Sequence, residues 1–142
     1  MTRADDSRWT LIFFAWLIAA LSTGGALFLS EVMALAPCVL CWYQRIFMFP
    51  LVFLLATGLF PFDPRVVRYA LPLAAGGLLV ALFHLLLTAG YIPESLTPCR
   101  QDVPCSTVQI EWFGFITIPL LSAFAFFAIN ALLVASYFRT SK

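Results

Sequence analysis

Four long apolar stretches dominate this sequence and leave few folds open to it. They run over residues 9–29, 42–60, 66–89 and 112–138. Each is long enough to cross the bilayer core, which is about 30 Å thick and needs about 20 apolar residues in a helix. Their polar side chains do not form a stripe on one helical face, so the helices should face lipid and each other. We therefore expect an all-α membrane protein, a four-transmembrane-helix bundle forming a single domain over residues 1–142.

The overall composition excludes the main soluble classes. The chain is 63% hydrophobic and 11% charged, whereas a soluble domain is about 45–50% apolar and about 25% charged. Its net charge is only +1 and it has no basic run, so a nucleic-acid partner is not expected. The expected surroundings are a lipid bilayer.

The first apolar stretch could instead be a cleaved signal peptide. Cleavage after Ala36 would leave Pro37 in the next position, which is poorly tolerated, and the stretch is longer than a typical signal core. The same proline makes the segment a poor lipoprotein signal. We therefore expect a retained membrane helix.

The distribution of basic residues predicts the orientation of the bundle. Six basic residues fall on one side, and the other side has only Arg45 and Arg100. Positive residues favour the cytoplasm, so both termini should be cytoplasmic and the first and third loops should face outward. The six residues on the inner side are Arg3, Arg8, Arg65, Arg68, Arg139 and Lys142.

All four cysteines fall in the two outward loops. Cys38 and Cys41 form a Cys-Val-Leu-Cys sequence before the second span, and Cys99 and Cys105 lie in the third loop. Disulfides persist on the outer side of a bacterial cytoplasmic membrane or in an endomembrane lumen. Both pairs could be structural disulfides, and four cysteines could also form a zinc site. A Cys-x-x-Cys ring constrains little chain, however, so redox chemistry is the favoured interpretation of the first pair, and no metal is expected.

The surroundings of Cys38 and Cys41 favour a reactive thiol. Pro37 should interrupt the preceding segment and place both cysteines at the start of a helix, whose N-terminal dipole lowers the pKa of a thiol. Arg45 lies one turn beyond Cys41. It could extend to lipid headgroups or stabilise a thiolate and the oxygen of an electron acceptor, and we favour the second role.

The nature of the acceptor follows from what the sequence lacks. It has no Gly-x-Gly-x-x-Gly motif for a dinucleotide, and its single histidine, His84, excludes bis-histidine haem ligation within one chain. A membrane quinone needs only an apolar slot and a few polar contacts. His84, within the third span, could be one such contact or could form a hydrogen bond between helices.

Two motifs resemble a known family. The segment from Pro37 to Arg45, Pro-Cys-Val-Leu-Cys-Trp-Tyr-Gln-Arg, resembles the signature of DsbB-type disulfide bond formation proteins. The segment from Glu111 to Pro119 is similar to the family's entry into its fourth span. The resemblance covers essentially the whole chain, including its four spans and two cysteine pairs. Five residues separate Cys99 from Cys105, which is similar to the short-loop, BdbC-like branch.

The resemblance implies an enzyme, a protein disulfide:quinone oxidoreductase. Such a protein reoxidises an extracytoplasmic DsbA-like oxidase of the thioredoxin fold and passes the electrons to the membrane quinone pool, either ubiquinone or menaquinone. It thereby supports disulfide formation in exported proteins. The alternatives are a structural or binding membrane protein with two rigid loops, and a bundle resembling vitamin-K-epoxide reductase, whose Cys-x-x-Cys comes late in the chain rather than before the second span.

The resemblance also assigns roles to individual residues. Cys99 matches the cysteine that forms the mixed disulfide with the partner, and Cys105 matches its loop mate. Cys38 and Cys41 match the pair that passes electrons to the quinone. Cys41 and Arg45 match residues beside the quinone ring, whereas His84 matches a family histidine only loosely.

Overall fold

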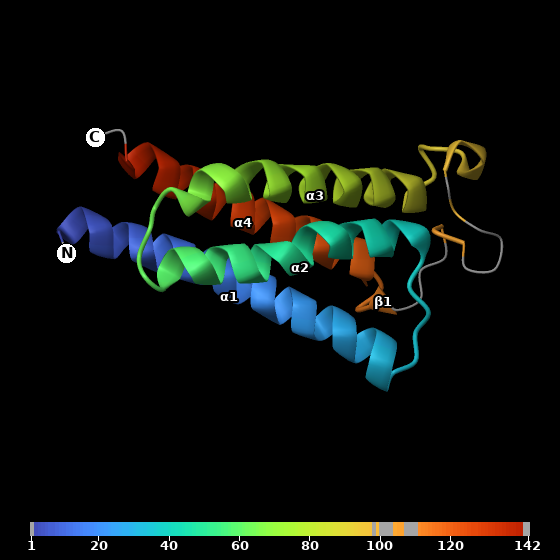
Figure 1. Cartoon of the computed structure of the whole chain (residues 1–142). Coiled ribbons are helices and arrows are strands. Elements are labelled where there is room, and N and C mark those ends of the chain that lie inside the picture. Colours follow the sequence, from blue (N-terminus) through green and yellow to red (C-terminus); the bar gives the residue numbers. More distant parts are fainter. Residues whose placement is uncertain (1, 98, 100–103, 107–110, 141–142) are drawn as a thin grey trace.

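The structure is a bundle of four long antiparallel helices (Figure 1). It is a computed structural model that describes residues 2–97, 99, 104–106 and 111–140. Within these residues, four helices are long and apolar enough to cross a membrane. Helices α1 and α3 each pack against both α2 and α4. The expected fold class is confirmed. The helices are α1 (Arg3–Leu27), α2 (Val39–Leu59), α3 (Val66–Thr88) and α4 (Ile118–Thr140).

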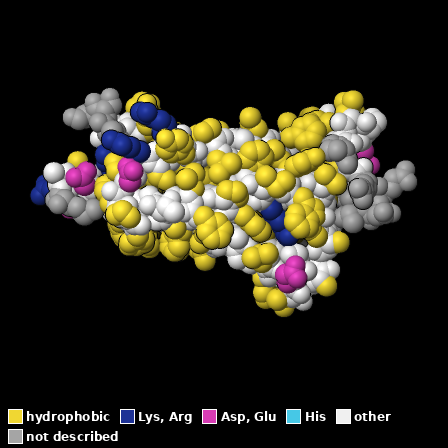
Figure 2. Space-filling model, viewed as in Figure 1, with side chains coloured by type: hydrophobic (Ala, Val, Ile, Leu, Met, Phe, Trp, Pro, Cys, Tyr) yellow, Lys and Arg dark blue, Asp and Glu magenta, His cyan; other side chains and the backbone are white. Residues whose placement is uncertain are grey.

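The two ends of the bundle differ in composition. The end with both termini and the α2–α3 connection, here called the terminal end, gathers the basic side chains, while hydrophobic side chains cover the middle (Figure 2). The other end, here called the cysteine end, carries the α1–α2 and α3–α4 connections. The structure thus places the predicted inner-side arginines on one end of the bundle. Arg100 and Lys142, which the orientation argument also used, lie outside the described residues.

Helix α1 begins with a capping box and ends in a wider turn. The side chain of Thr2 accepts a hydrogen bond from the backbone of Asp5, and the Asp5 carboxylate accepts one from the backbone of Thr2. This reciprocal pair satisfies two N–H groups that have no partner within the helix. At its other end α1 continues into the π-helix η1 (Phe28–Val32), so the first helix runs a few residues past the expected span.

The start of α4 differs from the sequence prediction. We expected the fourth span to begin near Trp112, but residues before Ile118 form a small antiparallel hairpin of β1 (Glu111–Trp112) and β2 (Ile116–Thr117). Phe113 and Gly114 both have positive φ, at 57° and 80°, which is incompatible with a right-handed helix. Apolar composition alone could not reveal this turn.

The main core fills the middle and the terminal end of the bundle. Helix α1 contributes Ile12, Ala15 and Ala19, all fully buried. Beyond Ala19 the described residues of α1 are half-buried or exposed, and α1 diverges from the other helices towards the cysteine end (Figure 1). The divergence leaves space beside the start of α2. The other buried members of this core include Leu51, Leu55, Ala70, Ala74, Phe126, Ile129 and Leu133.

Candidate redox site

Cys38 is the N-cap residue of α2. Its backbone is extended (φ −71°, ψ 171°), and its sulfur accepts a hydrogen bond from the backbone N–H of Cys41 at 3.4 Å. A side chain in this position meets the unpaired N–H groups and the positive end of the helix dipole. The structure therefore confirms that the cysteine pair opens the next helix, whereas the preceding helical segment already ends at Val32, before Pro37.

The surroundings of the Cys38 sulfur favour a thiolate. The Cys41 thiol lies 3.1 Å from it and can donate a hydrogen bond, and His84 Nε2 lies 3.9 Å away. These two contacts, the first being the larger, lower the pKa of Cys38 to about 4 even though the residue is buried and burial opposes ionisation. Cys38 and Cys41 are both free thiols, and the more ionised of the two faces α3.

The second cysteine pair forms a disulfide that lies close to Cys38. Cys99 and Cys105 are bonded to each other, with 6.0 Å between their Cα atoms. Cys105 is only 1% exposed and belongs to a small buried cluster with Cys38, Leu40 and Leu87. Two pairs that are far apart in the sequence are therefore neighbours at the cysteine end.

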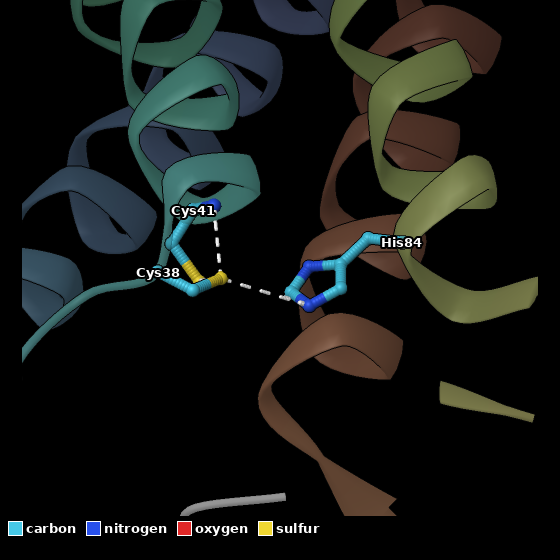
Figure 3. A group of neighbouring side chains, drawn as sticks. All are labelled: Cys38, Cys41 and His84. Atoms are coloured by element: carbon cyan, nitrogen blue, oxygen red, sulfur yellow. Dashed lines mark hydrogen bonds between the residues drawn. The ribbon is translucent and has the colours of Figure 1, made fainter. Parts of the chain in front are cut away.

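His84 lies between the two pairs. It projects from α3 towards Cys38 at the start of α2 (Figure 3), and its Nε2 also lies 3.2 Å from the backbone carbonyl oxygen of Cys105. The side chain is 3% exposed. The structure thus brings four predicted site residues together, namely Cys38, Cys41, His84 and Cys105.

Two further residues hold His84, and neither was singled out from the sequence. The amide nitrogen of Gln44 lies 3.0 Å from His84 Nδ1, and the hydroxyl of Ser122 donates to the amide oxygen of Gln44 at 2.6 Å. The signal for Gln44 was available, because a polar amide within an apolar span needs a partner. Ser122 gave no such signal, since serine is common in membrane helices and its partner is 78 residues away.

A cavity of about 390 Å³ lies on the other side of Cys41, where α1 diverges from α2 and α4. Its size falls in the range of small-molecule sites, and most of its lining is apolar. Both Cys41 and Arg45 line it, as do Gln44 and Ser122, whereas His84 lies outside the lining and faces Cys38. The remaining lining residues include Leu21, Gly25, Leu29, Met48, Leu121 and Phe126.

Arg45 joins α2 to α1 at this cavity. Its Nη2 donates to the carbonyl oxygen of Ala26 at 2.9 Å, and its guanidinium carbon lies 5.3 Å from the centre of the Trp42 ring. The same carbonyl also accepts a hydrogen bond from the hydroxyl of Ser30, which lies within the π-helix η1. Arg45 is half-buried, and these contacts hold its charge at the cavity rather than extended along the helix.

The same centre includes a set of atoms that could hold a metal ion. The sulfurs of Cys38 and Cys41 and a ring nitrogen of His84 all lie within 4.8 Å of one another, and a Cys₂His set is one that zinc uses. The contacts of His84 work against it, because the carbonyl oxygen of Cys105 lies 3.2 Å from Nε2 and requires a proton on the nitrogen that faces the sulfur. A dithiol placed next to a disulfide is better suited to thiol–disulfide exchange.

Comparison with known proteins identifies the family. The family model described as "Disulfide bond formation protein DsbB" matches residues 7–136. This chain belongs to the DsbB family. The predicted resemblance is thereby confirmed, and the chain is a multi-pass membrane protein of a family that carries out disulfide bond formation, an oxidoreductase chemistry.

Relatives of similar length carry related names. The chain is 47% identical over 134 residues to a "Probable disulfide formation protein" of Metapseudomonas resinovorans, covering 94% of this chain and 93% of the relative. It is 42% identical over 123 residues to "Disulfide bond formation protein C" of Bacillus subtilis (strain 168), covering 87% and 89%. A "Probable disulfide formation protein" of Coxiella burnetii (strain CbuK_Q154) is 38% identical over 134 residues, covering 92% and 90%. No solved structure gives a significant match.

Proposed function

We propose that this DsbB-family protein oxidises a soluble DsbA-like dithiol oxidase outside the membrane and passes the electrons to a membrane quinone. The observation that carries the proposal is that the two neighbouring cysteines face different sides of α2. Cys38 faces His84, whose Nε2 also contacts the carbonyl of Cys105, and shares a buried cluster with Cys105, whereas Cys41 lines the 390 Å³ cavity with Arg45. One sulfur of the pair is thus available to the loop disulfide and the other to a lipid-soluble acceptor.

The residues of the cavity fit a quinone. Its apolar lining suits a ring with a prenyl tail, and Arg45 supplies a hydrogen-bond donor for a ring oxygen. A bound quinone would accept two electrons and two protons. The Arg45 guanidinium would stabilise negative charge at a ring oxygen, and would do so more strongly here than at an exposed surface because the surroundings have a low dielectric.

The proposed exchange conserves electrons at each step. The reduced partner attacks the Cys99–Cys105 disulfide, Cys99 forms the mixed disulfide, and the partner leaves oxidised while Cys99 and Cys105 become a dithiol. That dithiol then reduces a Cys38–Cys41 disulfide. The arrangement in the structure, with the loop pair bonded and Cys38 and Cys41 free, corresponds to the next state, in which the two electrons reside on the pair beside the cavity. Loss of those electrons to a quinone regenerates the Cys38–Cys41 disulfide.

The energetics support a quinone rather than another thiol as acceptor. A DsbA-like partner is itself strongly oxidising, at about −120 mV. Each 30 mV of opposing potential costs about 1.4 kcal/mol for two electrons, so a typical thiol pair would not accept them. A quinone that respiration reoxidises provides a more oxidising acceptor.

The same proposal includes location and orientation. The arginines at the terminal end favour the cytoplasmic side, which places both termini in the cytoplasm and both cysteine pairs outside a bacterial cytoplasmic membrane. A reporter fused after Lys142 should be cytoplasmic, and one inserted near Glu94 should be external. A cytoplasmic Glu94 site would contradict the mechanism, because the cysteines would then face a reducing compartment.

Quinol formation by the purified protein tests the function directly. Detergent-solubilised protein, a reduced DsbA-like oxidase and a quinone should together yield quinol and oxidised partner in equal amounts. The alternative, a structural protein whose disulfides only rigidify its loops, predicts no quinol above the level without protein. Replacement of Cys105 by serine should also trap the partner on Cys99, and the trapped protein can then be identified.

A further inference from the structure

The hydrogen bonds around His84 determine which of its ring nitrogens carries the proton. The Gln44 amide nitrogen can only donate, and it lies 3.0 Å from Nδ1, so Nδ1 must accept and carries no proton. The Cys105 carbonyl oxygen can only accept, and it lies 3.2 Å from Nε2, so Nε2 must carry one. The contact from the third loop places a proton on Nε2, and the contact from α2 is consistent with the same Nε2–H tautomer.

Ser122 contacts the other end of the Gln44 amide. An amide could present either its oxygen or its nitrogen to His84. In the structure the hydroxyl of Ser122 donates to Oε1 at 2.6 Å, and the nitrogen of the same amide faces the imidazole, as a proton on Nε2 requires. Gln44 is 7% exposed and His84 is 3% exposed, so water does not compete freely for these groups.

The one ring N–H of His84 therefore points at the place where the cysteine pairs meet. Nε2 lies 3.9 Å from the Cys38 sulfur as well as 3.2 Å from the Cys105 carbonyl. A proton-bearing Nε2 can stabilise a thiolate at Cys38, whereas an unprotonated Nε2 would repel it. The tautomer thus decides whether His84 helps or hinders ionisation of Cys38.

We propose that Gln44 and Ser122 are positioning residues that hold His84 in its Nε2–H tautomer, so that its single ring N–H stabilises the Cys38 thiolate beside Cys105. The inference deepens the proposed function, on which its catalytic meaning rests. Neither Gln44 nor Ser122 touches a sulfur of the cysteine pairs in the contacts described above. Their effect passes through His84.

The tautomer can be measured directly because His84 is the only histidine in the chain. Protein labelled with nitrogen-15 histidine and purified through a tag without histidine gives one pair of ring-nitrogen signals. In the wild type at neutral pH, Nδ1 should be of the unprotonated type and Nε2 of the protonated type. A protonated Nδ1 with an unprotonated Nε2 would overturn the proposal. This measurement needs no quinone and no partner, so its failure is distinguishable from failure of the proposed function, which appears as no quinol from the wild type.

Two substitutions of Gln44 test the source of the preference. Gln44→Leu removes the donor to Nδ1, and the ratio of the Nε2–H to the Nδ1–H tautomer should fall about fivefold, the effect of one net hydrogen bond. Gln44→Glu keeps the shape but replaces the donor with an acceptor, so Nδ1 should become protonated. Ser122→Ala should lower the same ratio by a smaller factor. An unchanged spectrum in Gln44→Leu or Gln44→Glu would refute the relay.

A matched control and a second measurement separate positioning from general damage. Asn130→Leu removes a half-buried amide of α4 that donates a hydrogen bond to the carbonyl of Phe126 in the same helix. It should leave the tautomer unchanged. Cys41 and His84 are the titratable groups that face Cys38 in the described structure. The acid dissociation constant of Cys38, followed by the pH dependence of its alkylation, should fall about fivefold in Gln44→Leu and remain at the wild-type value in Asn130→Leu. Equal shifts in both variants would contradict a specific role for Gln44.

Discussion

The two ends of this bundle are both rich in apolar residues, but their helices pack together to different degrees. Near the terminal end, Gly58 allows α2 to approach α3 so closely that an added Cβ would lie 2.3 Å from a methyl group of Val66. Towards the cysteine end, an added Cβ at Gly24 or Gly25 would meet nothing within 4 Å. Here α1 diverges, and a cavity replaces the helix contact. The close-packed end stabilises the fold, and the open end leaves a cavity beside the Cys41 thiol.

The difference also extends to polar groups. At the cysteine end, buried and half-buried polar side chains form a continuous set of contacts from Ser122 through Gln44 and His84 to Cys38. At the terminal end, the guanidinium of Arg139 donates to the Ser7 hydroxyl and joins α4 to α1. One set of contacts meets the reactive sulfurs, whereas the other only connects helices near the membrane surface.

The largest expected effect follows from removing the sulfur of Cys41, which lines the cavity at the cysteine end. Cys41→Ser should lower quinol formation by at least about a thousandfold, because no second thiol remains to complete the disulfide. The loop disulfide should still exchange with a partner. Cys99→Ser should do the reverse and abolish partner capture while the Cys38–Cys41 pair still reacts with quinone. Partial and equal activity in the two variants would mean that the cysteines are structural.

The acidity of Cys38 predicts an unusual pH profile. Its pKa is lowered to about 4, so in reduced protein its alkylation rate should be nearly constant from pH 5 to 8 and should fall only as the pH approaches about 4. At pH 6 it should exceed the rate of an ordinary thiol by about fivefold, because its roughly thousandfold larger ionised fraction outweighs the lower nucleophilicity of a weakly basic thiolate. Alkylation with iodoacetamide and peptide mapping would measure both. A rate that rises tenfold per pH unit across this range would contradict a stabilised thiolate.

The same shift predicts the pH dependence of stability. Because the pKa of Cys38 in the folded protein lies below its ordinary value near 9, ionisation of this group stabilises the reduced protein. This contribution is fully present above that ordinary value and is lost as the pH falls through about 4. Cys38→Ser should therefore flatten the dependence of unfolding on pH in reduced protein, which denaturant titrations at several pH values would show.

Arg45 tests whether the cavity at the open end is the acceptor site. Arg45→Leu should raise KM for quinone about tenfold and slow turnover, since it removes the charge at the cavity wall along with the contact to Ala26. Arg45→Lys should retain part of the activity, because it keeps the charge but loses the planar fork. Arg68→Leu, which removes an exposed arginine of the terminal end, should leave KM unchanged. Wild-type kinetics in Arg45→Leu would move the acceptor site away from this cavity.

Gly58 and Gly24, which differ in the space around them, should affect activity least and are compared by their effect on stability. Gly58→Ala should lower the free energy of unfolding by about 1–3 kcal/mol, because the added methyl group must displace Val66. Gly24→Ala should change it by no more than about 0.5 kcal/mol, since open space surrounds the site. Denaturant unfolding in the same detergent measures both. Similar losses in the two variants would show that the ends are packed alike.

Sequence alone was enough to predict the number of spans, the common end of the bundle at which both cysteine pairs lie and the start of a helix at Cys38. Length and hydropathy decide whether a segment crosses a membrane, and a proline before a helix acts locally, so neither depends on distant contacts. The family signature from Pro37 to Arg45 is equally local. These features were predictable because each is set by residues next to one another in the chain.

Which groups meet at the site depends on how the helices pack. The hairpin before Ile118 depends on a left-handed turn at Phe113 and Gly114, which apolar composition does not encode. His84 was considered as a contact for the acceptor, yet it faces Cys38 and Cys105, and Arg45 joins α1 at the cavity. The roles of Gln44 and Ser122 depend on a contact across 78 residues. Contacts of this kind arise from how helices pack, and a single sequence does not specify which face of one helix meets which face of another.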